Sequence, residues 1–455
     1  MHYLVKRLGV VCLIALSSAW TRAAEFSIAA FSADVTVPLN HGMMGGLWQS
    51  ESVADPLFAK GVVLIGGEQP IVFVSVDWCE IRNEAFDRWR DVLAAAAGSS
   101  RERVLVSTVH QHDAPVADLG AQRLLEERGL EGSVCDLDFH EVAVQRVAKA
   151  LRESLPHAEA LTHIGLGQAK VKRIASNRRY LLPDGTPVFN RGSASAKNVL
   201  AREAPEGTID PWLKTLSFWS DERPVAALSG YATHPMSYYR TGEISADFPG
   251  DARARRQKDT PDCLQIYFSG ASGNVTAGKY NDGARANRAV LAGRLYDGML
   301  AAWKATRRQP IEQMDFRNVK LRLEPRSHGG FTQADYERIL QPGTDPWQQC
   351  LAAMGLSWRR RADAGREMDV PVIDFGEAQL LLLPGEIYVE YQLAAQQMDP
   401  DVLVLVAGYG DGATGYIPTE KHWEEGDPNL DDWCWVHPGA ERSVLKAIRS
   451  VLKPH

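Results

Sequence analysis

Short runs of β-branched and leucine residues alternate along the chain with longer segments whose apolar positions recur at helical spacing. Such apolar runs predict buried strands, because strands covered on both faces lose the polar alternation of exposed ones. The expected strands are 71–76, 103–109, 226–233, 264–268, 378–383 and 402–407, and the expected helices are 83–96, 139–155, 284–305 and 439–453. This pattern predicts an α/β fold with a large mixed β-sheet core covered by helices.

Metal-binding residue types stand at the ends of the predicted strands. His110 and His112 follow the strand 103–109, His234 follows 226–233, and Glu386 follows 378–383. A glycine-rich turn after the strand 402–407 leads to Tyr416. Ligands of open α/β sheets gather outside the carboxyl ends of the strands. Because two or three histidines with a carboxylate form a typical zinc set, we predict a metal site at these strand ends.

Each of these residues also has a simpler interpretation when it is taken alone. On a strand, His110 and His112 would project to one face with side chains about 7 Å apart. Both could bind one metal, one could bind it while the other moves protons, or both could simply form hydrogen bonds at the strand end. His234, before Pro235, is open to the same structural interpretation. Glu386 is harder to explain without a cation or a hydrogen-bond partner, since carboxylates are rarely placed beside a core.

Residues 1–23 predict a secretory signal peptide. Lys6 and Arg7 precede the apolar run 8–20, which is too short to span a bilayer comfortably. No later apolar stretch is long enough to predict a transmembrane segment, so we expect a secreted or periplasmic protein. The irregular region 174–214 suits a long excursion over an active-site face better than an interdomain linker. Residues 24–455 are therefore expected to form a single domain.

Charge narrows the classes of partner. The full sequence carries 50 basic and 57 acidic side chains, and loss of the leader would remove three basic ones, leaving a net charge of −10. Phosphate backbones and anionic membranes would be repelled, so we expect no nucleic-acid partner and favour a small-molecule or lipid substrate. Five cysteines remain after the leader, without C-x-x-C spacing, so at least one cannot pair within a monomer. The sequence leaves the oligomeric state unknown.

Short motifs follow one another along most of the chain. Among them are Thr108-Val109-His110-Gln111-His112, Thr233-His234-Pro235 and Pro384-Gly385-Glu386, and further motifs lie at 33–38, 72–77, 177–178, 245–247, 272–276 and 415–419. In type and order these motifs resemble the neutral, non-lysosomal ceramidases, which are exported zinc amidases that cleave the N-acyl bond of ceramide. The resemblance therefore implies an amidase for ceramide or a related N-acyl lipid.

The resemblance also implies roles for individual residues. It assigns a Zn²⁺ ion to His110, His234, Glu386 and Tyr416, an acid/base role to His112, substrate binding to Arg178, and a catalytic position to Thr276. Zinc with an open coordination position lowers the pKa of bound water to about 7 and polarises a carbonyl. A histidine with a pKa near 6.5 can accept that water's proton and return it to the leaving nitrogen. Arg178 could meet the developing oxyanion.

Four departures from the family pattern keep other functions open. Asp113 places a negative charge beside His112, Thr276 stands where the family usually carries serine, and the acidic stretch 424–432 occupies the place of a second active-site tyrosine. The chain is also expected to lack the C-terminal immunoglobulin-like domain of longer members. One alternative is a zinc esterase or amidase for a more polar acylated substrate. Another is a catalytically inactive exported binding protein on the same scaffold.

Overall fold

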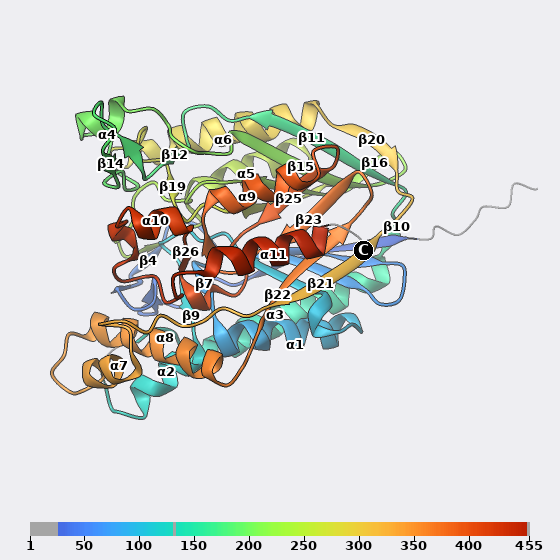
Figure 1. The fold of residues 1–455 in the computed structure, drawn as a ribbon. Coiled ribbons are helices and arrows are strands. Elements are labelled where there is room, and N and C mark those ends of the chain that lie inside the picture. The colour runs from blue at the N-terminus through green and yellow to red at the C-terminus, as the bar shows by residue number, and fades with distance from the viewer. Residues whose placement is uncertain (1–25, 131–132, 453–455) are drawn as a thin grey trace, which may run out of the picture.

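The structure, a computed structural model, describes residues 26–130 and 133–452 (Figure 1). The predicted signal peptide lies outside these residues. Among the helices of the described part, none combines the length and the apolar composition that crossing a bilayer requires. The five cysteines at positions 79, 135, 263, 350 and 434 are buried free thiols.

Three larger sheets form the framework. The first has the order β10-β1-β5-β6-β8 and contains β1 (Ser27–Asp34), β5 (Phe58–Ile65), β6 (Ile71–Val76), β8 (Val104–Thr108) and β10 (Glu159–Ala160). The second has the order β18-β16-β15-β11-β20 and contains β11 (His163–Lys170), β15 (Trp212–Ser220), β16 (Arg223–Tyr231), β18 (Leu264–Ser269) and β20 (Arg307–Pro310). The third has the order β21-β22-β23-β25 and contains β21 (Asp315–Leu321), β22 (Met368–Asp374), β23 (Ala378–Leu382) and β25 (Leu403–Ala407).

Each sheet contains one parallel strand pair joined through a crossover helix. The pairs are β6–β8, β16–β18 and β23–β25. The helices between them are α1 (Asn83–Ala97), α5 (Asp247–Asp259) and α9 (Val389–Met398). Parallel strands cannot be joined by a tight hairpin, so each pair needs such a crossover. The remaining pairs within these sheets are antiparallel, which makes all three sheets mixed.

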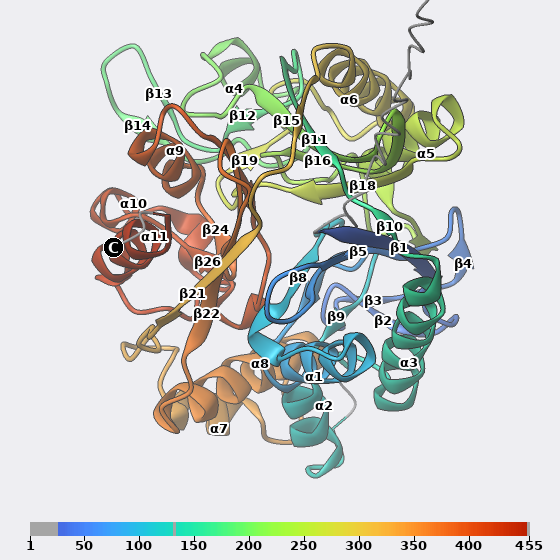
Figure 2. The same ribbon diagram turned by 90° about the vertical axis from the view of Figure 1, so that its right-hand side faces the viewer.

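The three sheets meet around a common centre (Figure 2). Apolar side chains from all three sheets, such as Phe73, Phe268 and Leu405, share one buried cluster. Further helices pack on the outside: α3 (Leu137–Ser154) on β1, α6 (Ala286–Lys304) on β11 and β15, and α11 (Ala440–Leu452) on β21. The other helices are α2 (Leu119–Glu126), α4 (Val199–Glu203), α7 (Gln333–Ile339), α8 (Pro346–Asp363) and α10 (Glu420–Glu424).

Hydrogen bonds tie the ends of β8, β18 and β25 to one another. The Thr108 amide donates to the Tyr409 carbonyl at 2.9 Å, and the Gly408 amide donates to the Ser269 carbonyl at 2.9 Å. The Ser269 hydroxyl in turn donates to the Val109 carbonyl at 2.7 Å. The loops that follow β8, β18 and β25 therefore lie close together.

The predicted α/β class, with helix-covered mixed sheets, is confirmed, and two details of the prediction are corrected. The strands form three sheets in place of one, because an apolar run marks a strand as buried without specifying its neighbours. The strand predicted at 103–109 ends at Thr108, and His110 has a left-handed backbone with φ of 71°. The two histidines therefore follow the strand and do not lie on it.

Asp77, in the 72–77 motif, has a structural role at the end of β6. Its two carboxylate oxygens accept hydrogen bonds from Arg253 of α5 at 2.7 and 2.6 Å, and both side chains are buried. Replacement of Asp77 by alanine would leave the arginine charge buried and unpaired, which costs about 3–5 kcal/mol. We expect urea unfolding of Asp77→Ala to show a free energy of unfolding lower by about this amount.

The half-buried ion pair between Asp91 and Arg101, at the protein surface, provides the control. Pairs of this kind contribute about 0–1 kcal/mol to stability, so the free energy of unfolding of Asp91→Ala should remain close to that of the parent protein. Equal stability of the Asp77 and Asp91 variants would contradict the structural role of Asp77.

Candidate metal centre

Three predicted ligands converge where the strand ends meet. His110 follows β8, His234 follows β16, and Glu386 begins the short strand β24 (Glu386–Ile387). All three side chains are buried. The Nε2 atoms of both histidines lie 3.1 Å from Oε2 of Glu386, and the three donor atoms lie within 4.8 Å of one another. The three residues thus follow strands β8, β16 and β23, one from each of the three larger sheets.

Backbone carbonyls set the tautomer of both histidines. Nδ1 of His110 lies 2.9 Å from the Cys79 carbonyl oxygen, and Nδ1 of His234 lies 2.7 Å from that of Ser272. A carbonyl only accepts, so each Nδ1 carries a proton, and in the neutral form of each ring Nε2 presents a lone pair to Glu386. A second ring nitrogen held by a carbonyl is the usual arrangement of metal-ligating histidines. Two imidazole nitrogens and a carboxylate oxygen this close together repel unless a proton or a metal cation lies among them, and two histidines with a carboxylate are a donor set that fits a divalent metal.

The charges of these groups follow from the same geometry. Burial works against a charge on Glu386, but His110 and His234 hold the pKa of its carboxyl well below the usual value. Burial likewise disfavours protonation of His110, yet the Glu386 charge raises the pKa of His110 above its ordinary range. Burial, with the nearby Arg178 charge, lowers the pKa of His234 to about 4. The site therefore holds a carboxylate and attracts a positive charge.

Tyr416 and Arg178 lie beside this cluster. Tyr416 is on β26 (Tyr416–Ile417), which pairs in parallel with β24 so that Tyr416 is opposite Glu386. Arg178 comes from the irregular region 174–214, and its Nη1 donates to the Tyr416 hydroxyl at 2.8 Å. Its Nη2 lies 3.2 Å from Nε2 of His234. The assignment of Tyr416 as a fourth ligand remains a prediction.

His112 faces the two histidine ligands from the cavity side. Its ring centroid is 5.2 Å from that of His110 and 5.9 Å from that of His234. Its Nδ1 is buried and has no hydrogen-bond partner among the described residues. Burial and the two other rings hold the pKa of His112 well below its ordinary value. A neutral ring with a free nitrogen can accept a proton at neutral pH.

Two neighbours of His110 were missed by sequence reasoning. The ring of Tyr409 stacks on that of His110 at 4.2 Å, and its hydroxyl lies 2.8 Å from the Ser272 hydroxyl. The sulfur of Cys79 lies 3.8 Å from Nδ1 of His110. Tyr409, like His110, has a positive φ, of 55°. Backbone strain of this kind clusters at functional sites, and the glycine-rich turn after β25 was the signal that could have pointed to Tyr409.

Thr276 and Asp113 are not brought to the centre. The hydroxyl of Thr276 lies 3.3 Å from the Gly192 carbonyl and accepts from the Gly278 amide, so it serves loop packing. The carboxylate of Asp113 lies 3.3 Å from Nη2 of Arg288. Neither side chain lines the cavity at the metal centre. The pairing of Asp113 with Arg288 removes one of the two observations that favoured a more polar substrate; the other, the expected lack of the immunoglobulin-like domain, is unaffected.

A cavity of about 320 Å³ opens onto the centre. Its lining comprises Met44, Leu47, Cys79, His110, His112, Arg178, Arg240, Trp347, Glu386, Tyr416, Pro428, Asn429, Asp432 and Trp433. The rings of Trp347 and Trp433 stack at 6.0 Å and form an aromatic wall. One part of the lining is therefore apolar, while the metal-binding and proton-accepting groups occupy another.

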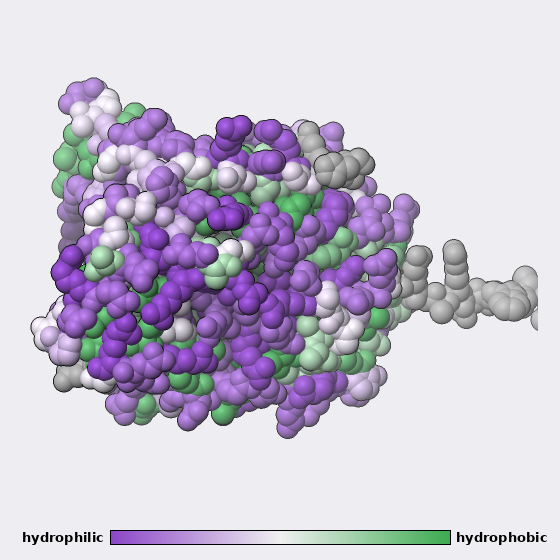
Figure 3. Space-filling view, turned by 60° about the horizontal axis from the view of Figure 1, so that its bottom comes forward, coloured by the Kyte–Doolittle hydropathy of each residue, from purple (hydrophilic) through white to green (hydrophobic). Residues whose placement is uncertain are grey.

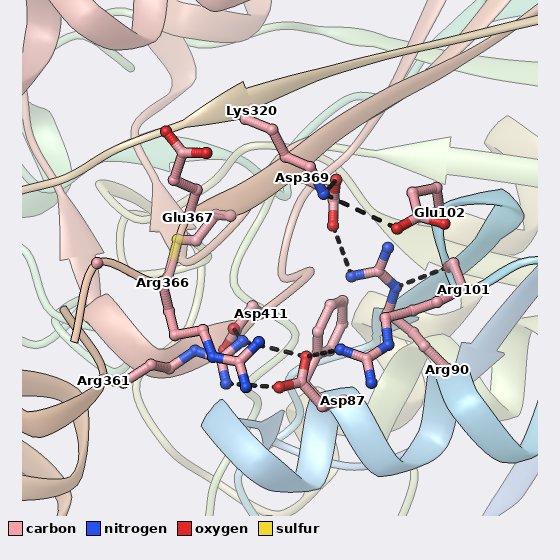
Figure 4. Close-up of a pocket in the computed structure, with 13 residues that line it drawn as sticks. Asp87, Arg90, Arg101, Glu102, Lys320, Arg361, Arg366, Glu367, Asp369 and Asp411 are labelled. Atoms are coloured by element: carbon pink, nitrogen blue, oxygen red, sulfur yellow. Dashed lines mark hydrogen bonds and ion pairs between the residues drawn. The ribbon is translucent and has the colours of Figure 1, made fainter.

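A second pocket lies where α1, α8 and β22 meet (Figure 4). Its charged side chains are largely paired with one another. Arg361 contacts Asp87 at 2.7 Å, and Asp369 contacts both Arg90 and Lys320. None of the thirteen described residues that line this pocket is a histidine or a cysteine. The chemistry is therefore concentrated in the cavity at the metal centre.

This chain is similar to known proteins in its three-dimensional structure and not significantly in its sequence. No protein-family model matches the sequence, and no curated protein matches it significantly. A neutral ceramidase from Pseudomonas aeruginosa superposes with a TM-score of 0.69 at 16% identity, covering 94% of this chain and 74% of that chain. A ceramidase complexed with C2 gives a TM-score of 0.69 at 14% identity, covering 94% and 75%. The fold implied by the resemblance is thereby confirmed.

Proposed function

We propose that this protein is an exported zinc-dependent amidase that hydrolyses the N-acyl bond of ceramide or a related N-acyl lipid. The observation that carries the proposal is the convergence of His110, His234 and Glu386 on one point beside His112 and Arg178. The fold shared with two ceramidase structures supports the choice of substrate. Fold alone does not determine function, so the side chains of the site decide the assignment.

The side chains of the cavity have complementary tasks in amide hydrolysis. The metal held by His110, His234 and Glu386 would supply a Lewis acid and a water of pKa about 7. His112 is placed to take the proton of the attacking water and to pass it to the leaving nitrogen. Arg178 is buried and always charged, and its Nε has no partner among the described residues, so it would meet the negative charge that develops on the substrate oxygen.

The size of the cavity indicates how a lipid would bind. A volume of about 320 Å³ is near the lower end of the usual range for small-molecule sites, about 300–1,000 Å³. The amide and the adjoining polar group of an N-acyl lipid fit such a space. The ends of its long chains would extend past the aromatic wall of Trp347 and Trp433.

Adjacent arginines provide a test of the proposal. Arg178→Ala removes a donor next to the candidate metal ligands, whereas Arg179→Ala breaks the pairing of Arg179 with Glu425, and neither of these two residues lines the cavity. With zinc-loaded protein and ceramide as substrate, we expect Arg178→Ala to lower kcat by roughly 10²–10³, as loss of one oxyanion donor does. Fatty-acid release is the measurement.

The Arg179 variant should retain parental kcat, and both variants should retain parental zinc content. Equal kcat values for the two variants would contradict the role of Arg178. Failure of the parent protein to release fatty acid from ceramide or other N-acyl lipids would contradict the proposed function itself.

A further inference from the structure

Large apolar side chains are exposed on the segment that carries Arg178. Val199 and Leu200 of α4 are 57% and 60% exposed, and Leu181 at the end of β13 (Tyr180–Leu181) is 49% exposed. Single exposed apolar residues need no explanation, but these three belong to one connection, between β11 and β15. We call Leu181, Val199 and Leu200 the α4 patch.

Several of the exposed apolar residues lie at the end of the molecule that holds the candidate metal centre. Figure 1 shows α4, β4 (Ser52–Val53) and β26 at this end, and Figure 3 shows hydrophobic residues reaching the surface there. Val53 on β4 is 49% exposed. The catalytic cavity is lined from the same end by Tyr416 of β26.

A buried arginine holds the α4 patch in a fixed relation to Arg178. Arg191 is fully buried, and its Nε donates to the carbonyl of Ala201 in α4 at 2.8 Å. Its Nη1 donates to the carbonyl of Asn177, the residue before Arg178, at 3.1 Å. A single guanidinium therefore bridges the exposed helix and the backbone that positions Arg178. A surface bound by α4 would lie in a defined position relative to the cavity.

We propose that the α4 patch inserts into the surface of a zwitterionic lipid membrane and holds the cavity mouth against it. The partner follows from the proposed function, on which this inference rests, because a cavity of about 320 Å³ takes the amide of a lipid while its chains remain outside. Apolar tips flanked by basic residues are suited to the headgroup boundary, and Lys197 and Arg202 flank Val199 and Leu200.

The charge of the protein determines which lipid surface it can approach. The formal net charge of the chain is −7, so an anionic surface would repel the protein as a whole. Close to the patch, the charge of Arg202 is offset by Glu203, which lies 2.9 Å away. Binding is therefore driven by burial of apolar side chains and should depend little on salt.

Vesicle sedimentation tests the inference with the full chain. The parent protein should cosediment with phosphatidylcholine vesicles, and Val199→Asp/Leu200→Asp should lower its partition coefficient roughly tenfold or more. Val142→Asp is the matched control, because Val142 is 45% exposed on α3, which packs on β1 and α1 away from the patch. Leu181→Asp provides an independent second variant. Circular dichroism should show the same helix content in all four proteins.

Hydrolysis separates docking from catalysis. The Val199→Asp/Leu200→Asp variant should match the parent on a water-soluble short-chain N-acyl substrate and should be roughly tenfold slower on a long-chain substrate embedded in vesicles. Vesicle binding that depends on the patch, with no hydrolysis of either substrate by the parent, would support docking and contradict the proposed function.

Three results would overturn the docking inference. The first is parent protein that does not bind the vesicles, or patch variants that bind as tightly as Val142→Asp. The second is binding that requires anionic lipid and disappears at high salt. The third is a concentration-dependent dimer in sedimentation equilibrium that the patch substitutions dissociate, which would make the patch an interface between protein chains.

Discussion

Replacing Glu386 by glutamine is expected to remove the bound metal and to lower kcat/KM by roughly 10³-fold or more. Oε2 of Glu386 is the point at which Nε2 of His110 and Nε2 of His234 meet, each at 3.1 Å. A neutral amide keeps the shape of the side chain and removes the negative charge that the cation requires. Elemental analysis of the purified variant, together with fatty-acid release from ceramide, measures both effects.

Glu377→Gln is the control for this substitution. Glu377 is an exposed glutamate that pairs with Arg307 on the surface. The control should retain parental zinc content and parental kcat/KM. A Glu386 variant that binds zinc as the parent does and hydrolyses ceramide at the parental rate would contradict the assigned metal centre.

Replacing His112 by alanine is expected to lower kcat by roughly 10²–10⁴ while leaving the zinc content unchanged. The reason is that His112 faces both histidine ligands, and its Nδ1 is buried without a partner among the described residues. The substitution removes the group that moves the proton and leaves the metal-binding atoms in place. Steady-state kinetics on the zinc-loaded variant separates kcat from KM, and the fall should be confined mainly to kcat.

His163→Ala controls for the loss of an imidazole elsewhere in the fold. His163 lies at the start of β11, and Nδ1 of its ring contacts the Thr162 hydroxyl. Its replacement should not change kcat. Parental kcat in His112→Ala would exclude proton transfer by this residue, whereas loss of zinc from that variant would make His112 a ligand.

The sequence predicted secondary structure best where burial dictates composition. The strand Ile71–Val76 was predicted with its observed bounds. A strand that is covered on both faces consists mainly of apolar residues, and all residues of this strand except one serine are apolar. The helix Asn83–Ala97 was predicted to within one residue. The division of the strands into three sheets was not predictable from these patterns, since pairing depends on contacts between segments distant in sequence.

The convergence of His110, His234 and Glu386 was predictable from the sequence, and the surroundings of this cluster were less so. His110, His234 and Glu386 were identifiable because each follows closely after a buried strand. A polar side chain placed this near to an apolar core usually has a ligand or a hydrogen-bond partner. Tyr409 escaped notice because its contact with His110 depends on how two loops cross. The sequence could not show that the Thr276 hydroxyl faces the Gly192 carbonyl, because a residue type in a motif does not specify where its side chain points.

X-ray absorption at the zinc edge of the purified protein tests the central claim most directly. The arrangement of His110, His234 and Glu386 predicts one zinc per chain, bound by nitrogen and oxygen at about 2.0–2.2 Å, and loss of this signal in Glu386→Gln. A protein that binds no zinc under these conditions, or one whose zinc is bound by sulfur at about 2.3 Å through Cys79, would contradict it.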